Sequence, residues 1–279
     1  MARRNNKSRT GASKSSPPQP PVESTINFVT PTEFVELPSK GRFYPEGHPF
    51  HRAEEIEINF MTAKEEDILS STTLLRKGIM LDRFIESVLV NKSVDAQTLY
   101  SGDRNAILLH SRITGYGSLY ETRITCPSCN KASDYTFDLS EYGIDYAEDI
   151  EDTGLSATPR GTYILEAPKS KVQLEIKLLD GKDEKYLTRL SESKKKNNLL
   201  ETPLTDMLKM LIISVNGDEN RKTIEDYVNS MPAFDSRYIR NIYAQINPNI
   251  DLTKDFSCSI CGNSTQLEVP LSADFFWPK

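Results

Sequence analysis

The chain has 279 residues, of which 37% are hydrophobic and 27% are charged, and its formal net charge is −6. This length suits one large domain or two modest ones. The charge is uneven, because residues 1–22 carry five basic side chains and no acidic one, which leaves −11 on residues 23–279. An acidic body argues against a broad nucleic-acid interface, since phosphate binding needs clustered positive charge.

No apolar run approaches the ~20 residues that cross a bilayer, so we expect no membrane span. The first residues lack the apolar core of a secretory signal, which indicates a chain that is not exported through that route. Cysteines in such a chain are better suited to metal binding than to disulfides.

Residues 1–25 are predicted to form a disordered, basic and proline-rich tail. They hold few apolar side chains to bury, and the prolines at 17, 18, 20 and 21 favour an extended linker. This tail is expected to be solvated, or to touch an acidic partner. Residues 26–53 follow as an extended arm, in which Phe43 and Tyr44 lie among turn-forming residues.

Residues 54–118 are predicted to be mainly helical after a strand at 54–60. Thr62 and Glu65 have the spacing of a capping box and place the start of the first helix. Gly78 is expected to interrupt the helical pattern, because glycine is a poor helix former.

Two more helices are expected in the same segment, the first restarting near Asp82 and the second near Asp103. The sequence Gly115-Tyr116-Gly117 is expected to end the second, since glycine accepts the positive φ of a helix C-terminus. Strands at 119–125 and 133–139 come next and flank the first cysteine pair.

Residues 140–254 are interpreted as a strand-plus-helix segment inserted between two halves of a module. An acidic, turn-rich connection is expected at 140–161. Alternating apolar residues predict strands at 162–166 and 172–179. One helix is predicted at about 183–197. Three more are predicted to begin at capping residues, which are Thr202, Thr223 and Asp235. The helix that begins at Thr202 is expected to bury Ile212 on its apolar face.

The four cysteines form two C-x-x-C pairs, Cys126 with Cys129 and Cys258 with Cys261, separated by 128 residues. Asn130 and Gly262 follow the pairs and tolerate the positive φ that such a turn needs. Four thiolates close a tetrahedral shell, so the pattern predicts one structural zinc ion per chain. A redox dithiol and free buried thiols are the alternatives.

The predicted fold is therefore α+β, with mixed helices and short antiparallel sheets. A zinc-ribbon-like module, made from residues 119–139 and 255–279, closes the chain.

Nothing in the sequence predicts an enzyme. The three histidines are His48, His51 and His110, and the first two could pair on a metal or simply be exposed in a loop. No nucleophile elbow, phosphate-binding glycine loop or zinc-hydrolase helix motif is present. Asp103, Arg104 and Asn105 form a dense polar stretch that suits a helix cap or a partner surface.

Several segments, taken in their order along the chain, resemble the baseplate protein family of T-even-type contractile-tailed bacteriophages, which includes a baseplate hub subunit. The resemblance covers about residues 36–279. Its segments are Pro38–Pro45, Met61–Leu69, Gly102–Ala106, Arg112–Gly117, the two cysteine pairs and Phe275–Pro278.

The resemblance implies a structural protein of a phage tail baseplate, assembled in the host cytoplasm, oligomeric in the assembly and bound to other baseplate or hub proteins. Two alternatives remain open. One is an assembly factor that is absent from the mature virion, and the other is a zinc-ribbon regulator that binds nucleic acid.

Aromatic residues near both ends of the chain are the predicted partner-binding residues, because aromatic side chains often anchor interfaces. Equally, these rings could cap the core of the chain itself. They are Phe43, Tyr44, Phe275, Phe276 and Trp277.

Overall fold

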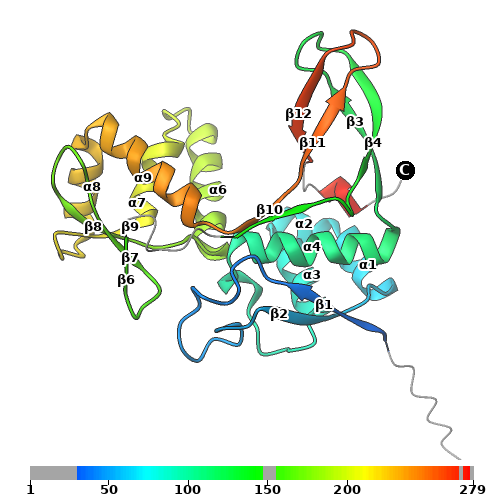
Figure 1. Cartoon of the computed structure of the whole chain (residues 1–279), viewed down its shortest axis with the longest axis horizontal. Coiled ribbons are helices and arrows are strands. Elements are labelled where there is room, and N and C mark those ends of the chain that lie inside the picture. Colours follow the sequence, from blue (N-terminus) through cyan, green and yellow to red (C-terminus); the bar gives the residue numbers. More distant parts are fainter. Residues whose placement is uncertain (1–29, 147–154, 270–272, 277–279) are drawn as a thin grey trace, which may run out of the picture. The chain divides into compact units, whose positions relative to one another are not determined.

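The computed structural model describes residues 30–146, 155–269 and 273–276 (Figure 1). The predicted tail at 1–25 and Trp277 lie outside these residues. Within them the fold is α+β, with helices and short antiparallel sheets, as predicted. No helix in this described part combines the length and apolarity needed to cross a membrane.

The first half of the described chain is built on one two-stranded sheet and a group of helices. The strands are β1 (Thr32–Glu36) and β2 (Glu55–Asn59), which pair antiparallel. The helices are α1 (Ala63–Ser70), α2 (Thr72–Lys77), α3 (Met80–Val88), η1 (Ala96–Thr98) and α4 (Ser101–Tyr116). The sequence predicted β2 but placed β1 in an irregular arm.

Local sequence signals explain where these helices begin and end. The capping box is present, with Thr62 accepting from the first turn of α1 and Glu65 bonding back to Thr62. Gly78 ends α2 in the left-handed conformation, with φ 64°. The apolar faces then meet in one core, which includes Val35, Ile58 and Phe84.

A buried carboxylate in the first turn of α4 ties the arm before β2 to this core. Asp103 is fully buried and accepts hydrogen bonds from Ser39 N (3.0 Å), Ser39 Oγ (2.6 Å) and Tyr44 Oη (2.7 Å). Burial raises the pKa of Asp103 despite these three donors. The dense polar stretch seen in the sequence therefore serves, through Asp103, to hold the chain's own arm.

A second core lies around a four-stranded antiparallel sheet in the order β6-β7-β8-β9 (Figure 1). Its strands are β6 (Ser156–Ala157), β7 (Tyr163–Glu166), β8 (Gln173–Ile176) and β9 (Ile212–Val215). Its helices are α6 (Gly181–Lys196), α7 (Pro203–Leu211), α8 (Arg221–Ser230) and α9 (Ala233–Ile246). Leu174, Leu211 and Ile239 are fully buried between them.

Two predicted helix starts were wrong in this part. Helix α8 is capped by Asn220 rather than Thr223, and α9 follows Pro232 rather than starting at Asp235. Asp235 instead accepts from the backbone N–H groups of Lys169 and Ser170, both at 2.8 Å, and so fixes the turn between β7 and β8.

The α7 prediction also needs two corrections. Thr202 stands at the N-cap of α7, but its side chain makes no capping bond. Ile212, predicted on the buried face of α7, is the first residue of β9, because the chain extends there to pair with β8.

The remaining strands form three short pairings. They are β3 (Leu119–Thr125) with β4 (Ala132–Asp138), β5 (Gly143–Asp145) with β10 (Asn249–Asp251), and β11 (Thr253–Ser257) with β12 (Ser264–Glu268). The sequence predicted β3 residue for residue. It missed β11, in which polar residues surround one buried ring, Phe256.

The last described element, η2 (Ala273–Phe276), is held by a buried arginine. Arg112 is 1% exposed and donates to three carbonyl oxygens, of Phe275 (2.8 Å), Gly117 (2.7 Å) and Leu119 (3.3 Å). Its guanidinium also lies over the Tyr116 ring at 5.3 Å. One side chain therefore joins the end of α4, the start of β3 and the last described residues.

We predict that Arg112→Leu lowers the melting temperature by roughly 2–12 °C. The change leaves the buried Phe275 carbonyl without its donor at a cost of about 1–3 kcal/mol, and each kcal/mol shifts melting by about 2–4 °C at this chain length. Calorimetry of the purified chain measures this. Arg83→Leu, at an exposed arginine, is the matched control and should melt near wild type. Equal melting of the two variants would contradict the role of Arg112.

Candidate metal centre

The two cysteine pairs occupy the turns of two β-hairpins. Cys126 and Cys129 lie between β3 and β4, and Cys258 and Cys261 lie between β11 and β12. The hairpins lie side by side in Figure 1, and a hydrogen bond from Tyr135 Oη to the carbonyl of Asp255 (2.9 Å) joins them.

Both turns have the same backbone geometry. Cys126 N–H donates to Lys131 O (3.0 Å) and Asn130 N–H donates back to Cys126 O (2.9 Å). In the second turn, Cys258 N–H donates to Asn263 O and Gly262 N–H to Cys258 O, both at 2.9 Å.

The residue after each second cysteine is left-handed, with φ 53° at Asn130 and 71° at Gly262. This confirms the expectation from the sequence. This left-handed residue tightens the turn, so that both thiols of a pair point toward one position.

The four sulfur atoms lie within 4.8 Å of one another. The Sγ atoms of Cys126 and Cys261 are 3.8 Å apart, and those of Cys129 and Cys258 are 3.9 Å apart. An ion bound tetrahedrally through Zn–S bonds of about 2.3 Å holds its sulfurs about 3.8 Å apart. The cluster therefore has the donor atoms and the size of a four-thiolate metal site, with two sulfur atoms from each hairpin turn.

A small apolar group packs beneath the thiols. Cys126 and Cys258 are buried, and Phe256 is fully buried beside them. The Tyr135 ring lies edge-on to Phe256 with centroids 5.1 Å apart. Cys261 is the exposed member of the four. These three buried side chains, with four half-buried ones packed against them, form a small core under the turns.

The thiols do not ionise independently. Backbone N–H groups of Cys261 and Ile260 lower the pKa of Cys258 to about 7. For Cys261, the Asn263 N–H lowers the pKa, but desolvation and the neighbouring thiols outweigh it and raise the value to about 11. One thiolate forms readily and then opposes the next, because like charges this close repel. A bound cation removes that repulsion, since metal ligands bind as thiolates.

The histidines do not come together as a metal pair. His48 Nε2 is 2.9 Å from Thr98 Oγ1 and its Nδ1 accepts from Phe50 N, while His51 Nδ1 is 2.6 Å from the carbonyl of Tyr44. Both are half-buried rather than exposed in a loop. They brace the turns of the arm.

Four of the five predicted partner-binding aromatics are buried inside the chain. The exposed fractions are 5% for Phe43, 2% for Tyr44 and 1% for both Phe275 and Phe276. Phe276 packs on Phe84 with ring centroids 4.9 Å apart. This placement fits the alternative in which the rings cap the chain's own core, and a docking role for them stays a prediction.

We predict that the four cysteines of the purified chain resist alkylation by iodoacetamide until a strong chelator is added. Cys261 is exposed, so only a bound metal protects it. Mass spectrometry counts the alkyl groups added per chain. The control is the chain unfolded in denaturant with chelator, in which all four cysteines should be alkylated. Rapid modification of Cys261 before chelation would count against a metal centre.

A comparison with protein-family models matches residues 30–277 to the family described as T4 bacteriophage base plate protein. No curated protein and no solved structure matches the chain. The family match covers all of the described residues, both cysteine pairs included, and confirms the resemblance found in the sequence.

Proposed function

The chain belongs to the T4 bacteriophage base plate protein family, and from that premise we propose that it is a permanent structural component of a contractile phage tail baseplate, located at the hub. Its role there is to dock other baseplate proteins within the virion tail. The observation that carries the proposal is the family match over residues 30–277, which includes both cysteine pairs.

We propose zinc as the metal of the four-cysteine cluster, acting as a structural staple. Four thiolates fill all positions of a tetrahedral ion and leave none for a substrate, as in structural zinc sites. When bound, the ion supplies charge neutralisation and a fixed geometry. The chain's own contribution is to bring the two turns together through the Tyr135–Asp255 bond and the buried Phe256.

The regulator alternative is supported less well. On the two hairpins that carry the thiols, Asp134, Asp255, Glu268 and Lys131 are exposed and Lys254 is half-buried. Mixed charge of this kind gives no continuous positive surface for phosphates.

We predict about one zinc per chain in freshly purified protein, and strong destabilisation by Cys258→Ser. Structural four-ligand zinc sites contribute on the order of 10 kcal/mol of apparent binding energy, so losing one thiolate should outweigh a single core change. Inductively coupled plasma mass spectrometry gives the metal and thermal melting gives the stability. Ser259→Ala, in the same turn, is the control and should retain zinc. Purified chain with far less than one zinc contradicts the staple.

The position in the virion has its own test. Mass spectrometry of purified phage particles should detect this chain together with the known tail proteins, at a constant ratio across preparations. If it is found in assembly intermediates and is absent from finished particles, the chain is the assembly factor rather than the permanent component.

A further inference from the structure

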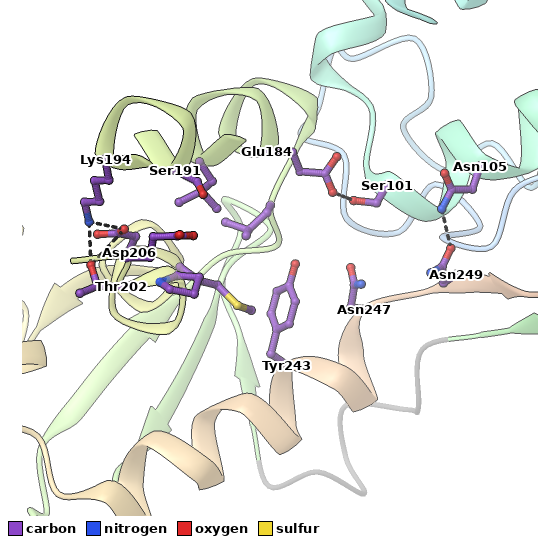
Figure 2. A pocket seen from close by; sticks show the side chains of 15 residues that line it. Ser101, Asn105, Glu184, Ser191, Lys194, Thr202, Asp206, Tyr243, Asn247 and Asn249 are labelled. Carbon is purple, nitrogen blue, oxygen red and sulfur yellow. Dashed lines mark hydrogen bonds and ion pairs between the residues drawn. The ribbon is translucent and has the colours of Figure 1, made fainter. Parts of the chain in front are cut away.

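A cavity of about 520 Å³ lies between helices α6, α7 and α9 and the first turns of α4, away from the cysteine cluster. Its walls combine apolar side chains, among them Leu187 of α6, Pro203 and Met207 of α7, with polar groups. Figure 2 shows the side chains of Tyr243 and Asn247 directed into this space from the end of α9.

Two polar groups of the wall have incomplete hydrogen bonding within the described part of the chain. The amide oxygen of Asn247 is buried without a partner. Burial raises the pKa of the Tyr243 hydroxyl to about 12, against the smaller lowering effect of the Leu179 backbone. The hydroxyl therefore keeps its proton, and no acceptor for that proton is found among the described residues. Buried groups of this kind gain stability when a partner supplies the missing bonds.

The connection between α6 and α7, together with the first turn of α7, forms one edge of the cavity and displays leucines to solvent. The exposed fractions are 60% for Leu199, 83% for Leu200 and 40% for Leu204. Adjacent Glu201, Thr202 and Pro203 line the cavity. We call the exposed leucines together with the cavity the α6–α7 face.

Hydrogen bonds and an ion pair fix the connection between α6 and α7. The ammonium group of Lys194 donates to Thr202 Oγ1 (2.6 Å) and pairs with Asp206 (Figure 2). The backbone N–H of Leu199 donates to Lys194 O at 2.9 Å, and Asn198 before it is left-handed, with φ 53°. A fixed loop loses little conformational freedom on binding, so it is suited to docking.

We propose that the α6–α7 face docks an apolar segment of a neighbouring baseplate protein, one that covers Leu199 and Leu200 and places a side chain in the cavity. The inference rests on the proposed structural role in the baseplate. The charge of the wall specifies the segment further, because three carboxylates and one ammonium group line the cavity. A segment with a basic residue beside its apolar side chains complements this surface.

The test uses phage lacking the chain's gene, complemented in the host with the full-length chain or with its variants. Leu200→Asp places a carboxylate in the apolar contact, and Ser191→Phe fills the cavity. Leu75→Asp, at a leucine on α2 that is 53% exposed, is the matched control. Thermal melting of each purified variant checks folding. Particle-associated chain is then quantified by mass spectrometry.

We expect both face variants to be reduced in particles by at least about tenfold, because a buried, unpaired carboxylate or a filled cavity removes the contact. The Leu75→Asp control should be present at the wild-type level. Normal incorporation of Leu200→Asp and Ser191→Phe, or equal loss of the folded Leu75→Asp control, would overturn the docking face and leave the proposed function standing. Absence of the wild-type chain itself from particles would instead overturn the proposed function.

Discussion

The fold depends on one constraint, which is that two hairpin turns separated by 128 residues must meet with four sulfurs within 4.8 Å. Everything between Cys129 and Cys258 then forms a closed loop, including the β6–β9 sheet and the helices on it. Closing a loop of this length costs entropy that grows only slowly with length, so a long insertion is thermodynamically acceptable. Among the described residues the closure is held by the small core around Phe256, by the Tyr135–Asp255 hydrogen bond and by the pairing of β5 with β10.

Buried polar side chains fix other distant segments of the chain. Asp103 and Asp235 both lie in the first turn of a helix, and each accepts backbone N–H groups from a distant loop. Arg112 does the converse, donating to three carbonyls at the end of α4, the start of β3 and η2. Irregular segments that have few apolar residues of their own are fixed in this way, because an unpaired buried polar group is costly. In a tail baseplate such fixed loops would present constant surfaces to neighbouring proteins.

The sequence predicted the elements whose signals are local. The capping box at Thr62, the break at Gly78, the β3 strand and the positive φ at Asn130 and Gly262 all follow from short-range stereochemistry. The four-cysteine cluster was also predictable, since two C-x-x-C turns with matching geometry need only be brought together.

Other features depend on distant contacts and left no local signal. Asp235 resembles a helix cap in sequence, yet its carboxylate is engaged by the turn at Lys169 and Ser170. Ile212 continues the apolar period of α7 but pairs with β8. The core positions of Phe275 and Phe276 depend on Arg112, which is 163 residues from Phe275.

The most direct measurement of the central claim is X-ray absorption at the zinc edge on the purified chain. Four sulfur neighbours at about 2.3 Å, with no nitrogen or oxygen in the first shell, is the result expected of one ion held by both hairpin turns. A shell with nitrogen or oxygen ligands, or fewer than four sulfurs, would contradict closure of the fold by these four cysteines.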